Sequence, residues 1–516
     1  ILRMITIVVI LISAFSAIYA FYLRSSTYWL RRGVVAVHPR SIIFGSSKDL
    51  MQKHYPRVLK YRDWGKEYGK TYGIKEGVQN TLVTSDLEMV QEIFVKQFDY
   101  FHSRKRVILG PNIDKDPRVN LFESRGARWK RLRTLSAPSF SVSSLKKIRP
   151  IVEDSVLNMV RIMEERHAGG ESFNIHQFYC EYTMDTIGRL VMGQKESLIF
   201  NNPRVAVAQS MFLRDFDRPV IYLNQAVPIL SPITMWGLET FSSKLSEGTL
   251  KIRAEMETAV YERIKQRESN PPDETTPTAD FIDLFLDFAA EMAETEKKEF
   301  KLSEAQVPKN LTVDEVVAQA MIFLLAGFDT TANALGFTSW ILATHPEVLQ
   351  RCKEEIDENC CDESISYEDL ANLTYTEAVC KETLRFYPLG AFGNSRLCMK
   401  DAEVCGMEIE SGTNIVVDVY GLHFDPSIWG EDVDEFKPER WLDTDRRVPP
   451  HAYIPFGVGP RICIGMRLAM MEEKIALAHI LRKFDIVKGT TATELELQGS
   501  LTITPVEVPV KIVPRK

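Results

Sequence analysis

The hydrophobic and polar positions divide the chain into a uniformly apolar N-terminal stretch and a long body of amphipathic segments. Residues 4–23 read MITIVVILISAFSAIYAFYL and carry no charged side chain. A helix of this length spans about 30 Å, which is the thickness of a bilayer core. The apolar core of a cleaved signal peptide is usually shorter, so we expect a membrane anchor over residues 1–24.

A basic stretch follows the apolar one. Eight Lys or Arg and a single acid, Asp49, lie between residues 24 and 60. Positive charge beside a span marks its cytoplasmic end, so we expect the body of the chain in the cytoplasm. We therefore divide the chain into an anchor (1–24), a basic linker (25–60) and one further domain (61–516).

Amphipathic helices predominate in this domain, and strand-like alternation is confined to three stretches. They are residues 41–44, residues 403–417 and the last twenty residues. Residues 82–98 read as a strand end, a turn at Asp86 and an amphipathic helix. The polar segments 266–280 and 294–310 read as surface connectors. The pattern predicts a mainly α fold with small β sheets, of the α+β class.

Residues 312–345 form the most informative helical pattern. Thr312 and Glu315 have the spacing of a capping box, and Pro346 predicts the end of the helix. The helix would be about 33 residues long and apolar on every side at its centre. A helix that is apolar all round is buried in a large core.

Two polar residues, Asp329 and Thr330, interrupt the middle of this helix. An Asp-Thr pair is usually an N-cap, but this helix begins more than fifteen residues earlier, after Thr312. Thr330 can donate a hydrogen bond to the carbonyl of Ala326, which bends a helix and opens a local groove. A buried acid beside a hydroxyl predicts a functional pair.

Composition and charge narrow the function classes. The chain is 45% hydrophobic and 26% charged, as in ordinary globular proteins, and its net charge of −7 gives no support for nucleic-acid binding. The eight cysteines are scattered and form no CxxC motif, which favours reduced thiols in a reducing compartment.

The stretch 455–465, PFGVGPRICIG, places Cys463 among glycines just before an amphipathic helix. A dinucleotide loop would need a third glycine where Ile462 stands, and too few residues follow for that fold. A zinc site would need a second Cys or His at ligand spacing. A buried structural cysteine remains as the simplest alternative.

The setting of Cys463 favours a metal bond. The N-terminus of a helix stabilises a thiolate, and glycines let the backbone approach a flat group closely. A thiolate with no second protein ligand indicates one axial bond to a metal that another molecule already holds. Haem iron is such a metal.

FGVGPRICIG resembles the haem loop of the cytochrome P450 superfamily. Four other segments resemble motifs of that family and occur in its order, and the resemblance covers about residues 30–514. The overall sequence is similar to the animal microsomal branch called clan 3. The linker RRGVVAVHPR departs from that branch, because it lacks the usual Pro-Gly-Pro run. The four segments are WKRLR (129–133), AGFDTT (326–331), ETLR (382–385) and FKPERW (436–441).

The resemblance implies a cytochrome P450 fold that binds haem b through the thiolate of Cys463. It implies that Asp329 and Thr330 deliver protons, and that Glu382, Arg385 and Arg440 form a charge network that holds the haem loop. The other residues that it implies for cofactor binding are Arg104, Trp129, Arg133, Arg396, Phe456, Arg461 and Gly465.

The resemblance also implies a function for the domain 61–516. It would be a haem-thiolate monooxygenase that inserts one oxygen atom of O2 into a lipophilic xenobiotic, steroid or fatty acid. NADPH–cytochrome P450 reductase would supply electrons, with cytochrome b5 as an optional second donor, at the endoplasmic reticulum membrane. A haem-thiolate isomerase or dehydratase, and a non-catalytic haem-binding protein, are the alternatives.

Three further expectations concern surfaces. Residues 220–236 either pack in the core or dip into the bilayer as a second membrane contact. Basic residues near the haem either form a docking surface for the reductase or are an ordinary solvated face. They are Arg128, Lys130, Arg131, Arg467 and Lys474. The predicted walls of the substrate pocket are 107–113, Phe212, Phe216, 323–327, 389–393 and 502–503.

Overall fold

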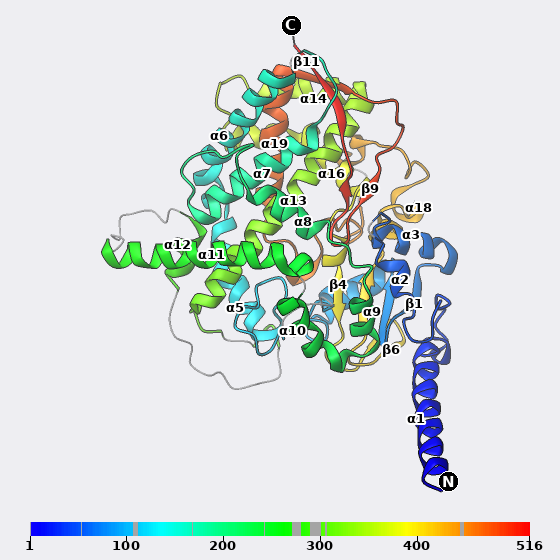
Figure 1. Cartoon of the computed structure of the whole chain (residues 1–516). Helices are drawn as coiled ribbons and strands as arrows, with labels where there is room; N and C mark the ends of the chain where they lie inside the picture. Colours follow the sequence, from blue (N-terminus) through cyan, green and yellow to red (C-terminus); the bar gives the residue numbers. More distant parts are fainter. Residues whose placement is uncertain are drawn as a thin grey trace.

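Helices build most of the domain, small sheets lie along one side, and one helix projects away from the rest (Figure 1). The computed structural model describes residues 2–515 apart from 53, 107–111, 168, 242, 271–279, 289–300, 305–306 and 444–447. The described α-helices are α1 (Leu2–Ser26), α2 (Ser47–Leu50), α3 (Arg57–Tyr68), α4 (Leu87–Gln91), α5 (Gly126–Ser136), α6 (Val142–His167), α7 (Ile175–Met192), α8 (Arg204–Phe212), α9 (Pro219–Ala226), α10 (Ser231–Phe241), α11 (Ser243–Ser269), α12 (Phe281–Leu286), α13 (Val313–Thr344), α14 (Pro346–Asn359), α15 (Tyr367–Asn372), α16 (Thr374–Phe386), α17 (Val419–His423), α18 (Pro426–Trp429) and α19 (Met466–Lys483).

The largest described sheet has the strand order β1-β2-β7-β4. β2 pairs in parallel with β7, and the other pairings in this sheet are antiparallel. A second sheet has the order β3-β11-β8, and β5-β6 and β9-β10 form two-stranded ladders. The described strands are β1 (Thr71–Glu76), β2 (Gln79–Thr84), β3 (Phe173–Asn174), β4 (Ser395–Leu397), β5 (Ala402–Val404), β6 (Met407–Ile409), β7 (Asn414–Val417), β8 (Phe484–Lys488), β9 (Leu497–Gln498), β10 (Thr504–Pro505) and β11 (Pro509–Pro514).

The predicted α+β class is confirmed, and the predicted strands are partly right. Strands do form within 403–417 and in the last twenty residues. The strand predicted over 41–44 is wrong, because the Ser41 hydroxyl accepts hydrogen bonds from the N–H groups of Ile43 and Phe44 and closes a turn. The hairpin β1–β2 was missed apart from its end, where Asp86 caps α4 as expected.

The long central helix α13 follows the sequence closely. The Thr312 hydroxyl accepts from the Glu315 N–H at 3.2 Å, and the Glu315 carboxylate accepts from the Thr312 N–H at 3.1 Å. The predicted capping box is therefore confirmed, and the helix ends at Thr344, just before Pro346. Most of its side chains are buried.

Two glycines let α7 pack tightly against α13. A Cβ on Gly327 would lie 2.8 Å from Cδ1 of Ile187, and one on Gly336 would lie 3.1 Å from Cδ2 of His176. Even alanine at Gly327 would therefore require the Ile187 side chain to shift. This close packing fixes where the middle of α13 presents Asp329 and Thr330.

Much of the segment predicted as a basic linker packs against the large sheet. Trp29 is buried, and its indole N–H donates to the Ile74 carbonyl at 3.0 Å. A Cβ on Gly73 would lie 2.1 Å from Cγ of Trp29, so only glycine leaves room for the indole ring. This contact ties the end of α1 to β1, in a chain whose linker has no Pro-Gly-Pro run.

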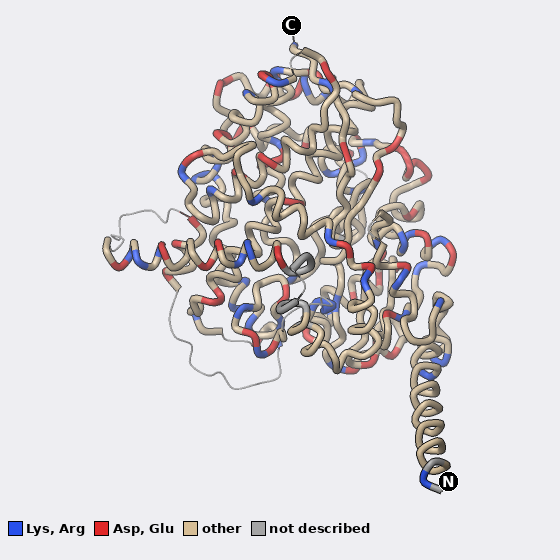
Figure 2. Tube along the Cα trace, viewed as in Figure 1, with Lys and Arg blue, Asp and Glu red and all other residues tan. Residues whose placement is uncertain are grey.

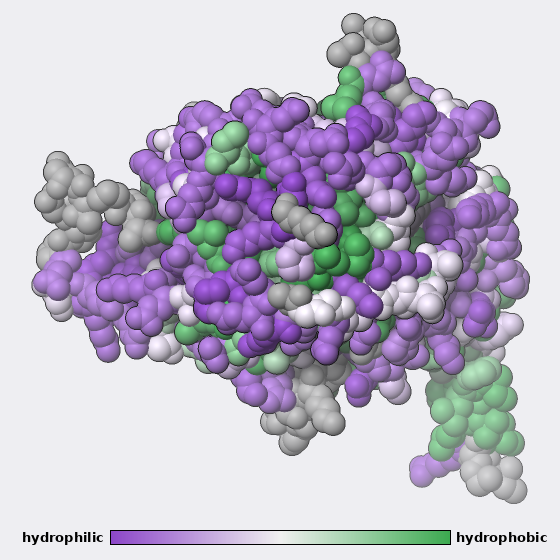
Figure 3. Space-filling model, turned by 90° about the horizontal axis from the view of Figure 1, so that it is seen from above, coloured by the Kyte–Doolittle hydropathy of each residue, from purple (hydrophilic) through white to green (hydrophobic). Residues whose placement is uncertain are grey.

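Helix α1 has no charged side chain between Arg3 and Arg24, whereas charged residues are spread over the rest of the fold (Figure 2). It stands out from the domain as an apolar rod (Figure 3), and Ile5–Ser26 is long and apolar enough to span a membrane. Among the described residues, α13 is also long and apolar enough to span a membrane, but most of it is buried in the core.

Residues 220–236 form α9, a short turn and the start of α10, beside the end of α1. The Tyr22 hydroxyl of α1 donates to the Ala226 carbonyl at 3.0 Å. Ile229, Ile233 and Trp236 are 83%, 65% and 60% exposed, so this part of the segment does not pack in the core.

A fully buried ion-pair network joins α16 to the chain that leads toward Cys463. Glu382 accepts from Arg385 at 2.8 and 3.0 Å and from Arg440 at 2.8 Å. The Trp441 indole N–H and the Lys437 backbone N–H also donate to it, at 2.9 and 3.1 Å. One carboxylate therefore compensates two buried guanidinium groups and fixes the segment 437–441.

We expect Glu382→Gln to destabilise the protein by about 3–5 kcal/mol, because it leaves the buried Arg385 without a counter-charge and leaves Arg440 only Asp432, at 3.4 Å. Thermal unfolding and the haem content of the purified protein measure the loss. Glu368→Gln is the control, since Glu368 pairs with Lys146 at the exposed surface and should change little. Equal behaviour of the two variants would contradict a structural role for the network.

Candidate active site

Cys463 lies in a tight loop before α19. Its N–H donates to the Phe456 carbonyl at 2.8 Å, which closes the loop on itself. Gly459 has φ +72°, and a Cβ there would lie 2.1 Å from the Phe94 carbonyl oxygen. A Cβ on Gly465 would lie 4.0 Å from the Cys463 sulfur. Small residues therefore leave the sulfur uncovered, and Cys463 is exposed.

The Cys463 thiol is reached by solvent although protein atoms surround it closely. Burial raises its pKa, while the N–H groups of Gly465 and Met466 and the charges of Arg133 and Arg104 act to lower it. The cationic groups and the start of α19 prepare the sulfur for ionisation. A bound metal ion would complete the ionisation of this thiol, because a thiol that coordinates a metal is deprotonated.

Four arginines from separate segments surround this loop. Burial lowers the pKa of each guanidinium, and Arg104, Arg133 and Arg396 lower that of Arg461 further by like-charge repulsion. Arg104 donates to the carbonyls of Gly393, Phe122 and Arg461, while Arg461 donates to those of His102, Phe122 and Ser124.

These four arginines, which we call the arginine cluster (Arg104, Arg133, Arg396 and Arg461), form no ion pair with a carboxylate in the described part of the chain. Nε of Arg396 is buried without a hydrogen-bond partner. Buried cations require anions, so the cluster fits a ligand that brings its own carboxylates. Haem has two propionates, and the cluster together with the uncovered Cys463 sulfur fits it.

Trp129 and Arg133 share helix α5, one turn apart. The Trp129 ring is buried, and the Arg461 guanidinium lies 4.8 Å from its centroid. The indole therefore supports Arg461 by a cation–π contact. Phe456 is half-buried and precedes the two glycines of the loop.

Thr330 lies near the middle of α13, which is helical throughout. Its hydroxyl donates to the Ala326 carbonyl at 2.8 Å, as predicted. Ala326 is exposed and Thr330 is partly exposed, although most of α13 is buried. An exposed patch in the middle of a core helix marks the wall of an internal groove.

Asp329 is buried on another face of α13. Its Oδ2 accepts from the Thr502 hydroxyl at 2.6 Å and from the Asn333 amide at 2.9 Å. Burial raises its pKa to about 7, although both hydrogen bonds act to lower it. Asp329 and Thr330 are neighbours in sequence, but their hydrogen bonds go to different partners.

The sequence did not indicate Asn333 as a site residue, and it indicated Thr502 only as a pocket wall, not as a partner of Asp329. Asn333 lies one helical turn after Asp329, and it also contacts Thr504 at 3.1 Å and His176 at 2.8 Å. Its i, i+4 spacing could have revealed it. Thr502 is 173 residues away in the chain, so only the tertiary fold brings it to Asp329.

The basic docking surface proposed around α5 and α19 is wrong for most of its members. Arg131 is buried and pairs with Glu315 at 2.6 Å, and Arg128 pairs with the same carboxylate at 3.1 Å. Lys474 is buried and pairs with Glu377 at 2.9 Å. These cations tie helices together instead of facing a partner. Lys130 donates to the Leu302 carbonyl at 2.7 Å, and Arg467 is exposed.

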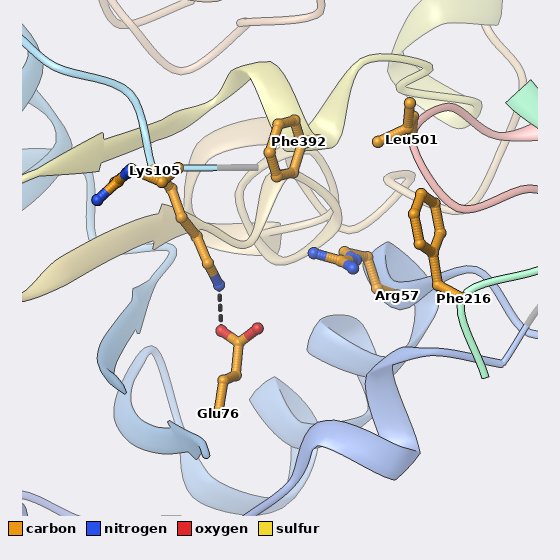
Figure 4. Close-up of a pocket in the computed structure, with 7 residues that line it drawn as sticks. Arg57, Glu76, Lys105, Phe216, Phe392 and Leu501 are labelled. Carbon is orange, nitrogen blue, oxygen red and sulfur yellow. Dashed lines mark hydrogen bonds and ion pairs between the residues drawn. The ribbon is translucent and has the colours of Figure 1, made fainter. Parts of the chain in front are cut away.

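The residues predicted to line the substrate pocket lie in different parts of the structure. Residues 107–111 lie outside the described residues. Phe323 packs in an aromatic core cluster with Phe140, Phe281 and Phe285. Phe216 and Phe392 line a small pocket, which Figure 4 shows.

Comparison with known proteins points to the same family as the geometry of Cys463 and the arginine cluster. A model of the cytochrome P450 family matches residues 37–512. Putative cytochrome P450 CYP13A3 of Caenorhabditis elegans is 42% identical, over 98% of this chain and 99% of that protein. CYP13A1 of the same organism is 43% identical, over 97% and 98%, and cyp-13B1 is 39% identical, over 98% and 99%.

The family match covers nearly the whole body of the chain, and the relatives are similar from end to end. The predicted family is therefore confirmed. Its members bind haem through a cysteine thiolate, and they generally take electrons from a redox partner. The protein belongs to the cytochrome P450 family of haem monooxygenases.

Proposed function

We propose that this protein inserts one oxygen atom of O2 into a lipophilic xenobiotic, steroid or fatty acid at the endoplasmic reticulum membrane. Electrons come from NADPH through NADPH–cytochrome P450 reductase, with cytochrome b5 as an optional donor. The observation that carries the proposal is the uncovered Cys463 sulfur beside the arginine cluster, which pairs with no carboxylate among the residues that the structure describes.

The residues of the site have distinct roles in this proposal. Cys463 binds the haem iron, and the arginine cluster together with Trp129 binds the propionates. Bound haem activates O2 and supplies the oxidising power. Phe456 and Gly465 pack beside the sulfur. The network of Glu382, Arg385 and Arg440 acts indirectly. It holds the segment that leads into the Cys463 loop.

Thr330 and Asp329 handle protons in the groove. The Thr330 hydroxyl gives its own hydrogen to the Ala326 carbonyl, so its oxygen lone pairs can accept a hydrogen bond from a water. Asp329, with a pKa of about 7, can take up and release a proton near neutral pH. Asn333 and Thr502 hold its carboxyl in place.

The membrane arrangement follows from α1 and the exposed side chains beside it. Helix α1 spans the bilayer with the domain on the basic, cytoplasmic side. Ile229, Ile233 and Trp236 are exposed near its end and enter the lipid surface as a second contact.

Cys463→Ser tests the haem ligand directly. The reduced, CO-bound wild-type protein should have the strongly red-shifted Soret band of a thiolate-ligated haem, and the variant should lose it. A difference spectrum of the purified proteins measures the band. An unshifted wild-type band, or a variant that keeps the shift, would contradict the assignment.

Thr330→Ala should uncouple the reaction, because water in the groove loses its hydrogen-bond acceptor. NADPH oxidation should continue, while the product formed per NADPH falls several-fold and hydrogen peroxide rises. Thr344→Ala is the control, since Thr344 makes a similar back-bond at the end of α13. An unchanged ratio of product to NADPH in Thr330→Ala would remove Thr330 from proton delivery.

Asp329→Asn should change how stability depends on pH. The folded state holds the proton of Asp329 up to a pKa of about 7, whereas the unfolded chain releases it near its ordinary value. Wild-type stability conferred by this proton is therefore complete below about pH 4 and is lost as the pH rises toward 7. Unfolding free energies of the two proteins should diverge by about 1.4 kcal/mol per pH unit in that window. Parallel curves would mean that Asp329 is ionised in the fold.

Removal of residues 1–24 should leave detergent-assayed activity intact and only weaken membrane binding. In the truncated protein, serine at Ile229, Ile233 and Trp236 should release it from vesicles, as measured by flotation. Leu157→Ser, an exposed apolar position on α6, is the control and should change nothing. Complete solubility of the truncated protein would contradict the second contact.

A further inference from the structure

A small pocket on the N-terminal side of the fold is lined by charged and apolar side chains. Its walls come from α3, β1, the chain after Ser103, the chain after α8, η5 (Ala391–Gly393) and the chain after β9 (Figure 4). The lining residues are Arg57, Glu76, Lys105, Arg106, Phe216, Phe392 and Leu501. We refer to it as the Arg57 pocket.

The charges of the Arg57 pocket do not balance. Lys105 and Glu76 form a buried ion pair, with side chains 4% and 1% exposed. Glu76 also accepts from the Thr81 hydroxyl at 3.0 Å. Its Oε1 is therefore occupied within the fold, whereas its Oε2 is buried without a hydrogen-bond partner. Beyond the Lys105–Glu76 pair, the positive charges of Arg57 and Arg106 are in excess.

Arg57 is placed to bind an anion. Nη2 of Arg57 lies 3.6 Å from the Met51 sulfur, which is a weak acceptor, and its Nε is buried without a hydrogen-bond partner. Figure 4 shows its guanidinium pointing into the space between the Lys105–Glu76 pair, Phe392 and Phe216. Burial tends to raise the pKa of Glu76, but the charges of Lys105 and Arg57 lower it, so the Arg57 charge acts on this pocket. In the described part of the chain, neither Arg57 nor the exposed Arg106 forms an ion pair with a carboxylate.

Two walls of the Arg57 pocket lead to the active site. Phe392 lies 5.8 Å from the Arg57 guanidinium and stacks on Phe122, whose carbonyl accepts from Arg104 of the arginine cluster. Leu501 precedes Thr502, which holds the carboxyl of Asp329. Phe392 is therefore linked through Phe122 to Arg104 of the arginine cluster, and Leu501 is linked through Thr502 to Asp329.

On the basis of the proposed function, we infer that the Arg57 pocket binds the carboxylate of an amphiphilic substrate, whose apolar chain passes Phe392 and Leu501 toward the site. The planar guanidinium of Arg57 matches a carboxylate with two parallel hydrogen bonds, and Arg106 adds a second positive charge at the surface. Phe216, Phe392 and Leu501 favour methylene groups next to the head group. The substrate class is thus a long-chain monocarboxylic acid.

The test compares dodecanoate with dodecanol, which has the same chain length and no charge. Their dissociation constants are measured by equilibrium dialysis against the full-length holoprotein in discs of phosphatidylcholine, a lipid without net charge. The wild-type protein should bind the acid about tenfold to a hundredfold more tightly, as expected for a charge-assisted bidentate contact. Equal binding of the two ligands would overturn the inference.

The variants locate the preference. Arg57→Gln should abolish most of the preference for the acid. Arg57→Lys should keep part of this preference, because lysine retains the charge but cannot form the two parallel hydrogen bonds of a guanidinium. Arg62→Gln is the matched control on the same helix, outside the Arg57 pocket, and should keep the full preference. Arg106→Gln, at an exposed position that folding tolerates, should reduce the preference independently. A preference that survives in Arg57→Gln and Arg106→Gln would overturn the assignment to this pocket.

Failure of this inference can be told apart from failure of the proposed function. Cys463→Ser should lose turnover yet keep the preference for the acid, because binding in the Arg57 pocket does not require oxidation. A wild-type protein that oxidises neutral lipophilic compounds and binds both ligands equally would refute the carboxylate pocket alone. A protein that prefers the acid but oxidises no substrate would refute the proposed function alone.

Discussion

Buried positive charge must be compensated at several places in this fold, and the way it is compensated distinguishes one group of arginines from another. A buried guanidinium is tolerated only when an anion or several oriented carbonyls face it. For Arg385 and Arg440 the chain supplies that anion itself, because Glu382 accepts hydrogen bonds from both. The resulting network needs no ligand and holds the segment that leads to Cys463.

The arginine cluster is compensated differently. Backbone carbonyls face Arg104, Arg396 and Arg461, and no carboxylate in the described chain pairs with them. Their mutual repulsion is a cost that the fold accepts, and in the proposed function the haem propionates relieve it. Both groups of arginines are largely buried, so burial alone does not distinguish them. The presence of a protein carboxylate marks Arg385 and Arg440 as structural, and its absence among the described residues marks the arginine cluster as the proposed binding site.

Close helix packing sets the opposite wall of the site. Gly327 and Gly336 let α7 approach α13, and the Thr330 back-bond to Ala326 lies on the part of α13 that stays open. The carboxyl of Asp329 is turned away to Thr502 and Asn333. The helix therefore presents a hydroxyl to the groove and keeps a titrating acid behind it.

Features that depend on local spacing could be predicted from the sequence. The capping box at Thr312, the end of α13 before Pro346, the Thr330 back-bond and the Cys463 loop each depend on residues a few positions apart, so a motif reveals them. The α+β class followed from the helical and alternating periods. The family could be predicted because five short motifs occur in the order that is typical of it.

Pairs of charges from distant segments could be assigned only once the fold was known. In sequence, Arg128 and Arg131 look like an exposed basic stripe, but both donate to Glu315, almost two hundred residues away. Thr502 reaches Asp329 across 173 positions, and Arg57, Glu76 and Lys105 share a pocket although no motif links them. Charge pairing is decided by distance in space, and periodicity along the chain carries no information about contacts between distant segments.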